Sequence, residues 1–433
     1  MGLIETLAGK VIRRGELTII FPDGKQRTFG APEPGHRKST VRVRDGKALR
    51  RILSNPRLGV GEAYMDGSLT VEEGDIYDFL DLITFNARWE RGGGERHAIR
   101  KRGKIRGKID QLNWRSRSKR NVAHHYDIGN RLYELFLDRD LQYTCAYFTD
   151  PANSIEEAQD DKKAHLVSKL RLKPGQRVLD IGSGWGGLAL YMNEVADVDV
   201  LGITLSEEQL VVARQRAEAA GVADRVKFVM MDYRDLPENE RFDRITAIGV
   251  LEHVGPPDFE TFFGKIHNAL EEDGIALVHF LGRLGKPGTT DPWTAKYIFP
   301  GGYNPSLSQV IKASEQVKLI STDIEQLRMH YAHTCRRWLE RTRANRQEIV
   351  ELYDERFFRM WEFYMAGSIT AFENGGCCNY QIQYVRNRYA LPTIRDYMVE
   401  EEKPLREALA NARAEETKPK PKGRKPRAKA KVS

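Results

Sequence analysis

The spacing of hydrophobic and polar residues is most regular from Ser154 onward. There, short apolar runs typical of buried strands alternate with longer segments that carry apolar residues at helical spacing. The pattern predicts helices at 154–170, 187–195, 206–220 and 258–271, and strands at 177–181, 198–203, 226–230, 242–249 and 274–280. Strands and helices that alternate in this way form a parallel, doubly wound α/β sheet. Ligands of such sheets bind at the carboxyl ends of the strands.

The flanking segments have weaker patterns. Residues 1–87 predict a small mixed α+β domain without evident catalytic residues, for which a lipid-binding role is expected. Residues 88–120 predict a basic linker. The expected elements before Ser154 are strands at 17–21 and 41–43 and helices at 49–53, 76–85 and 121–136. Within the first domain, Glu62-Ala-Tyr-Met-Asp-Gly67 is either a packed turn or a binding element.

The segment after the sheet pattern reads as a long insertion at 282–376. It predicts a Pro/Gly/Trp-rich loop to Ser308, a strand near 317–321 and helices from about 333 to 372. Phe357-Phe-Arg-Met-Trp-Glu-Phe-Tyr-Met365 is apolar over much of its circumference, which favours either buried core or the wall of an apolar tunnel. A final strand at 378–384 is expected to close the sheet. The main domain is therefore placed at 121–400, with a C-terminal segment at 401–433.

One glycine-rich turn stands out, at Val178-Leu-Asp-Ile-Gly-Ser-Gly-Trp-Gly-Gly187. Glycine permits positive φ and lets backbone N–H groups approach a ligand. The Gly-x-Gly-x-Gly spacing differs from the dinucleotide pattern, and no phosphate-binding Lys follows. Asp180 ends the strand, where a carboxylate can meet an amine or a hydroxyl. These features favour S-adenosylmethionine (SAM) as the ligand over an ordinary tight turn.

Composition fits a globular enzyme of two or three domains, since 40% of the 433 residues are hydrophobic and 30% are charged. No apolar run reaches the roughly 18 residues of a membrane span, and the first residues do not read as a signal peptide. A cytoplasmic location is therefore expected. The four cysteines fit reduced thiols, and their spacing does not suggest a metal site.

The net charge of +8 is unevenly distributed. Residues 417–433 carry eight Lys/Arg and no acid, and residues 88–120 carry thirteen Lys/Arg against three acids. Two basic segments on a mildly acidic body suggest contact with a polyanion, either anionic lipid or nucleic acid.

Several stretches together resemble the cyclopropane-fatty-acyl-phospholipid synthase family, which includes the mycolic acid cyclopropane synthases, over roughly residues 50–390. They are His125-Tyr-Asp-Ile-Gly-Asn130, Tyr143-Thr-Cys-Ala-Tyr-Phe148, the glycine turn, Gly202-Ile-Thr-Leu-Ser206 with Gln209, Glu252-His-Val-Gly255, Asp291-Pro-Trp293 with Lys296-Tyr-Ile-Phe-Pro300, and His330-Tyr-Ala-His-Thr334. The resemblance implies a Rossmann-like SAM-dependent methyltransferase domain with a helical acyl-binding insertion. It also implies SAM-dependent formation of cyclopropane rings on unsaturated phospholipid acyl chains at the inner face of the membrane.

The resemblance also implies the positions of two binding sites. SAM is expected at Tyr143, Thr144, Asp180, Gly182, Ser183, Gly184, Thr204, Leu205, Gln209, Tyr233 and Arg234. The second strand ends in Ile203-Thr204 without an acidic residue, so Gln209 is expected to bind the ribose. A bicarbonate ion is expected at the catalytic residues Cys145, Glu252, His279, Leu281 (through its backbone) and Tyr331.

The expected chemistry requires a base close to the acyl chain, and a small bound anion can serve as that base. Attack of an alkene on the sulfonium methyl leaves a carbocation, and ring closure then requires removal of a proton by a nearby base. Water must be excluded, or the cation becomes an alcohol. The faces of Tyr143, Tyr147 and Phe148 are expected to stabilise the positive charge.

Other interpretations stay open at this point. Cys145 and Tyr331 also fit core positions, Glu252 fits a helix start, and His279 fits a strand histidine with its hydrogen bonds satisfied. A hydride shift would give a methyl-branched or methylene chain in place of a ring. A nucleic-acid methyltransferase is not expected, because Gly255 precedes the two prolines where Asn or Asp would be typical. A catalytically silent lipid-binding protein and a homodimer are also kept open.

The basic tail provides the first prediction. Deleting residues 417–433 should weaken binding to phosphatidylglycerol vesicles, more at low salt than at high salt, because each basic residue near an anionic leaflet contributes about 1 kcal/mol that salt screens. SAM affinity should not change. Equal sedimentation of the truncated and full chains with these vesicles at low salt would instead assign the membrane contact to residues 88–120.

Overall fold

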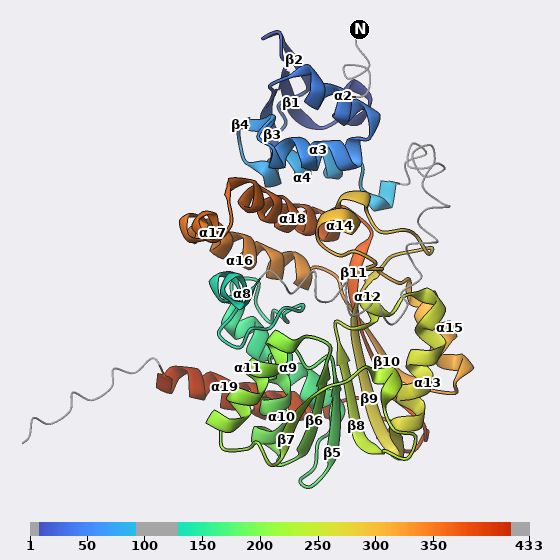
Figure 1. Cartoon of the computed structure of the whole chain (residues 1–433). Coiled ribbons are helices and arrows are strands. Elements are labelled where there is room, and N and C mark those ends of the chain that lie inside the picture. Colours follow the sequence, from blue (N-terminus) through green and yellow to red (C-terminus); the bar gives the residue numbers. More distant parts are fainter. Residues whose placement is uncertain (1–7, 92–128, 417–433) are drawn as a thin grey trace, which may run out of the picture.

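The computed structural model describes residues 8–91 and 129–416. These residues form three layers: an N-terminal unit with a four-stranded sheet, a middle layer of helices, and an α/β layer on a seven-stranded sheet (Figure 1). Most of the expected basic linker, residues 121–128 of the expected helix and the tail at 417–433 lie outside the described residues.

The seven-stranded sheet has the order β10-β11-β9-β8-β5-β6-β7. Its strands are β5 (Arg177–Ile181), β6 (Asp199–Thr204), β7 (Val226–Met230), β8 (Phe242–Ile248), β9 (Leu270–Arg283), β10 (Ile320–Leu327) and β11 (Cys377–Val385). β11 runs antiparallel to both of its neighbours, β10 and β9, and the other neighbouring pairs are parallel. The chain leaves β5 toward β6 and β7 and then returns to β8 on the other side. The predicted doubly wound sheet is confirmed, and its switch point lies between β5 and β8.

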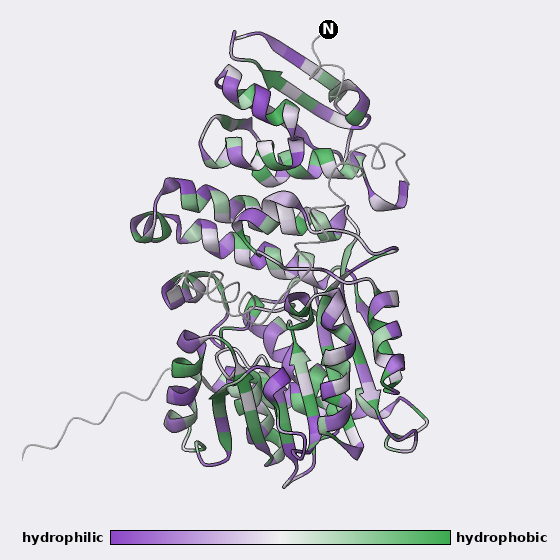
Figure 2. Cartoon of the chain, turned by 45° about the vertical axis from the view of Figure 1, so that its right-hand side comes forward, coloured by the Kyte–Doolittle hydropathy of each residue, from purple (hydrophilic) through white to green (hydrophobic). Residues whose placement is uncertain are grey.

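Helices cover both faces of this sheet. One face packs against α9 (Ile155–Leu170), α10 (Gly187–Ala196) and α11 (Glu207–Ala219), and the other packs against α13 (Phe259–Ala269) and α15 (Leu307–Gln316). The last helix, α19 (Tyr397–Glu416), lies along α9. The strands are mostly hydrophobic, whereas the helices carry mixed surfaces (Figure 2). Ser154 begins α9 with a capping box to Glu157, which satisfies backbone N–H groups of its first turn.

The middle layer connects the two sheets. It contains α8 (Gly129–Phe136), α14 (Pro292–Tyr297), α16 (His330–Ala344), α17 (Arg346–Leu352) and α18 (Glu355–Glu373). The N-terminal unit has the strand order β2-β1-β3-β4, made of β1 (Gly15–Ile20), β2 (Gln26–Ala31), β3 (Lys38–Val43) and β4 (Leu69–Glu73). Its helices are α2 (Gly46–Ser54), α3 (Pro56–Met65) and α4 (Ile76–Asn86), of which α3 and α4 pack on α18. A continuous apolar core crosses this contact.

Polar contacts also join the N-terminal unit to the middle layer. Glu62 accepts hydrogen bonds from Lys296 Nζ at 2.7 Å and from the Tyr297 hydroxyl at 2.8 Å, and the Tyr64 hydroxyl donates to Glu362 at 2.6 Å. The Glu62–Gly67 segment therefore completes α3 and its following turn, and it contacts α14 and α18. This is the packing role, not the binding role, of the two that the sequence allowed.

Several helices and strands differ in position or type from the prediction. The segment 307–316 is a helix, begun by a capping box between Ser306 and Gln309, and the strand expected near 317–321 runs over 320–327. This strand has no regular apolar alternation in the sequence, and its place is set by pairing with β11. The strand expected to close the sheet, β11, lies inside it, and β10 forms the edge. The strands β2 and β4 were not predicted, since β2 is almost fully solvent-exposed.

Within the described ranges, no helix has the length and apolar character needed to cross a membrane.

Candidate functional site

A cavity of about 800 Å³ opens at the carboxyl ends of β5, β6, β8 and β9 and extends beneath α18. All sixteen predicted site residues line it. The predicted SAM residues there are Tyr143, Thr144, Asp180, Gly182, Ser183, Gly184, Thr204, Leu205, Gln209, Tyr233 and Arg234, and the predicted catalytic residues are Cys145, Glu252, His279, Leu281 and Tyr331. The fold thus brings the two predicted sets into one continuous space.

The glycine turn after β5 has the backbone conformation that the sequence predicted. Gly182, Gly184 and Gly186 have φ values of +75°, +54° and +85°, which are unfavourable for residues with a Cβ. A Cβ on Gly182 would lie 2.4 Å from Val250, whereas a Cβ on Gly184 would meet no protein atom within 4 Å. Gly184 therefore faces open space in the cavity, where a ligand can approach the backbone.

Polar groups beside the glycine turn fit a cofactor with hydroxyl and amino groups. Thr204 donates its hydroxyl hydrogen to Gln209 Oε1 at 3.2 Å, which leaves the Gln209 amide NH2 to donate to a ligand. Asp180 accepts from the Thr246 hydroxyl at 2.7 Å, and burial raises the pKa of Asp180 to about 6. The Ser183 hydroxyl is buried and has no partner within the described residues.

Arg234 already has a partner. Its guanidinium forms an ion pair with Asp232 at 2.6 Å beside Tyr233, in the short helical turn Tyr233–Asp235. Arg234 lines the cavity, and Asp232 holds its orientation.

The Tyr143–Cys145 segment is held from behind by α9. The Lys162 ammonium donates to Thr144 Oγ1 at 2.8 Å and to Gln142 Oε1 at 2.6 Å, and Gln159 donates to the Thr144 carbonyl at 3.0 Å. Lys162 is fully buried, and this burial lowers its pKa to about 8. Sequence reasoning missed Lys162, because a lysine in the middle of a helix normally indicates a solvent-exposed face.

Glu252 is a buried ionisable group of the cavity. The strand β8 ends in a turn at Gly249, whose N–H donates to the His279 carbonyl at 2.8 Å, and α12 (Leu251–Val254) begins immediately after it. This places Glu252 at the carboxyl edge of the sheet with only 7% of its surface exposed. One carboxylate oxygen accepts from the Leu281 N–H, and the other is buried without a partner in the described part of the chain. Burial raises the pKa of Glu252 to about 7.

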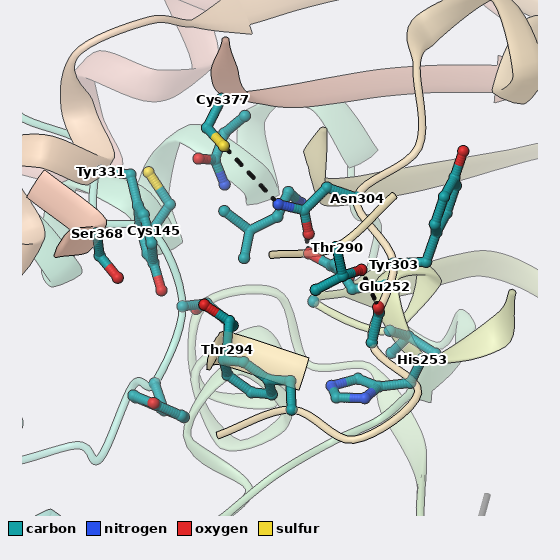
Figure 3. A pocket seen from close by; sticks show the side chains of 18 of the residues that line it. Cys145, Glu252, His253, Thr290, Thr294, Tyr303, Asn304, Tyr331, Ser368 and Cys377 are labelled. Carbon is teal, nitrogen blue, oxygen red and sulfur yellow. Dashed lines mark hydrogen bonds between the residues drawn. The ribbon is translucent and has the colours of Figure 1, made fainter. Parts of the chain in front are cut away.

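The remaining predicted catalytic residues are buried and uncharged. Burial and the nearby lysine charges lower the pKa of His279 to about 3, so its imidazole is neutral at physiological pH. Burial raises the pKa of the Cys145 thiol and of the Tyr331 hydroxyl. None of these three supplies a charged nucleophile. Cys145, Tyr331 and Ser368 lie on one side of the cavity, across from Glu252, His253 and Tyr303 (Figure 3).

The apolar walls of the cavity come from several layers. Phe299, Phe363, Tyr364 and Phe372 line it, as does Tyr143, whose hydroxyl lies 3.2 Å from that of Tyr364. The expectation that Tyr147 and Phe148 face the reacting groups was wrong. Tyr147 stacks between His165 and His330, and Phe148 packs near His330 and His333. The alternating direction of side chains in an extended segment turns them away from the cavity.

The N-terminal unit, for which a lipid-binding role was expected, contributes residues to the cavity. Val60 of α3 and Leu80 and Ile83 of α4 line its far end. Arg57 lines it as well, in an ion pair with Asp291 at 2.9 Å. Both candidate roles of the 357–365 segment hold in part, since Phe363 and Tyr364 line the cavity while Trp361 and Met365 are buried in the core.

The fold and the glycine turn are those of the class of SAM-dependent methyltransferases. Comparison with known proteins identifies the family within this class. The mycolic acid cyclopropane synthetase family matches residues 114–382, and a domain family of unknown function (DUF7884) matches residues 10–88. The chain belongs to the mycolic acid cyclopropane synthetase family of SAM-dependent methyltransferases.

Individual relatives agree with this assignment. The chain is 37% identical to the cyclopropane-fatty-acyl-phospholipid synthase of Escherichia coli K12, over 81% of this chain and 89% of that protein. It is 34% identical to a probable fatty acid methyltransferase of Pseudomonas putida, over 87% and 94% of the two chains. The solved structure of the mycolic acid cyclopropane synthase CmaA1 complexed with SAH and CTAB is 29% identical, with a TM-score of 0.58 over 61% of this chain and 97% of that one.

Gly184 provides a direct test of the cofactor end of the cavity. Gly184→Ala should weaken SAM binding on the order of tenfold, because a Cβ would enter the open space and strain the positive φ. Calorimetric titration with SAM measures this change. Gly175→Ala is the matched control, since Gly175 also has positive φ (+79°) and open surroundings but does not line the cavity. Equal SAM affinity in the two variants would contradict the assignment of the turn.

Proposed function

We propose that this protein transfers a methylene group from SAM to the cis double bond of unsaturated acyl chains in membrane phospholipids, which gives cyclopropane fatty acids. The observation that carries the proposal is the continuous cavity. It connects the glycine turn after β5 with apolar walls beneath α18, and the buried carboxylate of Glu252 follows β8, the strand next to β5.

The residues of the glycine-turn end fit SAM. Gly184 leaves open space for a ligand, the Ser183 hydroxyl lacks a partner among the described residues, and Gln209 retains an amide donor. When bound, SAM supplies an electrophilic methyl group on a sulfonium. Gln209 would then replace the acidic residue that binds the ribose in many methyltransferases, and the ring of Tyr143 would stabilise the positive charge.

The apolar end fits an alkene in an acyl chain. An alkene is a weak nucleophile, and the cation that it forms reacts readily with water, so the walls must exclude solvent. Phe299, Phe363 and Phe372 present hydrocarbon surface, and Leu80 and Ile83 extend it into the N-terminal unit. The long alkyl chain of CTAB, bound in the CmaA1 structure, is consistent with such a channel.

The proton released during ring closure requires a base close to the acyl chain. The pKa of Glu252, near 7, suits a group that accepts a proton and later releases it at physiological pH. The unpartnered oxygen of Glu252 fits a small polar guest, for which we propose bicarbonate as the immediate base. Cys145 and Tyr331 would complete the enclosure of that anion, His279 would support it from behind, and Glu252 would receive the proton.

A second outcome of the same chemistry is a methyl-branched or methylene chain, formed when a hydride shift precedes proton loss. The relative named a probable fatty acid methyltransferase favours keeping this alternative. The choice depends on the distance between the base and the delivered methyl group. For either product, we propose peripheral attachment to an anionic membrane through the basic segments at 88–120 and 417–433.

The function is tested by incubating the purified protein with SAM and vesicles of monounsaturated phospholipid. We expect SAM consumption with these vesicles and none with saturated ones, and mass spectrometry should show a gain of one CH2 with loss of the alkene. A gain of CH2 with retained unsaturation would favour the alternative. No SAM consumption with either vesicle would refute both.

Glu252→Gln should lower turnover at least about 100-fold while SAM affinity stays unchanged. Native turnover should rise with pH through about 7, as Glu252 ionises, and the variant should lack this rise. The control is Glu260→Gln, on the exposed side of α13. An unaltered pH profile in Glu252→Gln, or a loss of SAM binding, would contradict the assigned role.

Glu252→Gln should lower turnover but should raise the stability of the folded protein above neutral pH. Burial raises the pKa of Glu252 from its usual 4.5, so the folded state binds this proton more tightly than the unfolded chain. The protonated Glu252 side chain therefore makes its full contribution to the free energy of unfolding below pH 4.5. This contribution is lost as the pH rises through about 7. At pH 8 the variant should therefore be more stable than the native protein, by up to about 3 kcal/mol, with no such gain near pH 4. Thermal unfolding at both values measures this difference.

A further inference from the structure

Two amide side chains on β11 lie beside His279. Asn379 pairs with Leu281 of β9, and Gln381 pairs with His279. Residues that pair directly across two strands present their side chains on the same face of the sheet. Asn379 is only 1% exposed and lines the cavity, and Gln381 is fully buried. The proposed reaction has so far used neither amide.

A buried lysine fixes the orientation of Gln381. The Lys169 ammonium donates to Gln381 Oε1 at 2.8 Å, and Lys169 also forms an ion pair with Glu325. The two ends of a side-chain amide have similar shapes, so hydrogen-bond partners decide its orientation. An ammonium can only donate, so the oxygen of Gln381 must face Lys169. The NH2 group of Gln381 then faces His279 Nδ1, at 3.2 Å.

This orientation determines the tautomer of His279. An NH2 group directed at Nδ1 requires a lone pair on Nδ1, and a neutral imidazole with a lone pair on Nδ1 carries its hydrogen on Nε2. The Asn379 amide contacts Nε2, with its nitrogen placed 3.2 Å away. Two N–H groups cannot form a hydrogen bond with each other. The oxygen of Asn379 must therefore face His279, and its NH2 group must take the other position.

Before the amide oxygen and nitrogen are exchanged, this other position holds Asn379 Oδ1. That oxygen is buried and makes no hydrogen bond to any described residue. The unpartnered oxygen of Glu252 belongs to the same cavity, and Glu252 binds the N–H of Leu281, the residue opposite Asn379. An anion beside two acceptor oxygens would be repelled, whereas an NH2 group would bind it.

We infer that Asn379 is an anion-binding residue, which donates a hydrogen bond from its NH2 group to the small oxyanion held beside Glu252. Lys169, Gln381 and His279 act as positioning residues that hold Asn379 in this orientation. His279 then acts through Asn379, because its one N–H is used in holding the Asn379 oxygen. This inference rests on the bicarbonate site of the proposed function and adds a donor that the sequence motifs did not indicate.

The tautomer of His279 is measured by 15N NMR of protein labelled at histidine, with the His279→Gln variant assigning the signals. The native protein should show the hydrogen on Nε2 and a lone pair on Nδ1. Gln381→Leu should give a mixture of tautomers, because it removes the donor that requires a lone pair on Nδ1. A hydrogen on Nδ1 in the native protein would overturn the proposal.

The anion is tested with bicarbonate itself. In the presence of SAH, bicarbonate should raise the melting temperature of the native protein, because a ligand that binds only the folded state stabilises it. Asn379→Asp should lower the bicarbonate affinity derived from this shift at least tenfold, and Asn379→Leu should do the same. Asn379→Asp should keep the native tautomer of His279, since a carboxylate still accepts from Nε2. The charge-matched control is Asn268→Asp, at an exposed position of α13.

The outcomes separate this inference from the proposed function. Equal bicarbonate affinity in the native protein and both Asn379 variants would overturn it, as would the absence of any bicarbonate effect on the native protein. Neither measurement needs lipid. They decide the role of Asn379 even if the native protein fails to consume SAM with unsaturated vesicles, a result that would overturn the proposed function alone.

Discussion

The proposed reaction depends on keeping the ionisable carboxylate of Glu252 out of water. Among the described residues the Glu252 carboxylate has one partner, the Leu281 N–H, and only 7% of the residue is exposed, so its charged form is disfavoured and its pKa rises toward neutrality. A solvated carboxylate at the same position would be a weak base near an unprotected cation. Burying Glu252 costs free energy, but it raises the pKa of the carboxyl group to a value that suits the proposed proton transfer. The rest of the fold keeps Glu252 buried.

Closure of the cavity requires all three layers. The parallel sheet supplies the glycine turn and the strand ends, α18 supplies much of the apolar wall, and α3 and α4 supply the far end. The polar contacts of Glu62 with Lys296 and Tyr297 hold the N-terminal unit against α14, which belongs to the middle layer. The Lys296-Tyr-Ile-Phe-Pro300 motif therefore has a structural role at a boundary. The N-terminal unit is part of the channel, although no residue in it is proposed to be catalytic.

The sequence was informative where local rules decide the structure. Apolar runs and helical spacing identified the parallel strands, and the glycines of 182–186 indicated positive φ. The sequence was not informative where residues that are distant along the chain determine the structure. The strand β10 lacks a regular apolar alternation and is held by pairing with β11 and by ion pairs such as Asp323 with Arg395. Lys162 and Asn379 carry no local sign of their partners, although the alternation of Asn379, Gln381 and Gln383 with apolar residues is typical of a buried strand with one polar face.

The central claim is that a base in this cavity removes a proton from the newly delivered methyl group. It is tested most directly with SAM that carries a fully deuterated methyl group, followed by mass spectrometry of the acyl chains. The account predicts a product that retains two of the three deuterium atoms and has no alkene, with the third released to water. Retention of all three deuterium atoms in the product would show that the methyl group is never deprotonated, and would contradict the account.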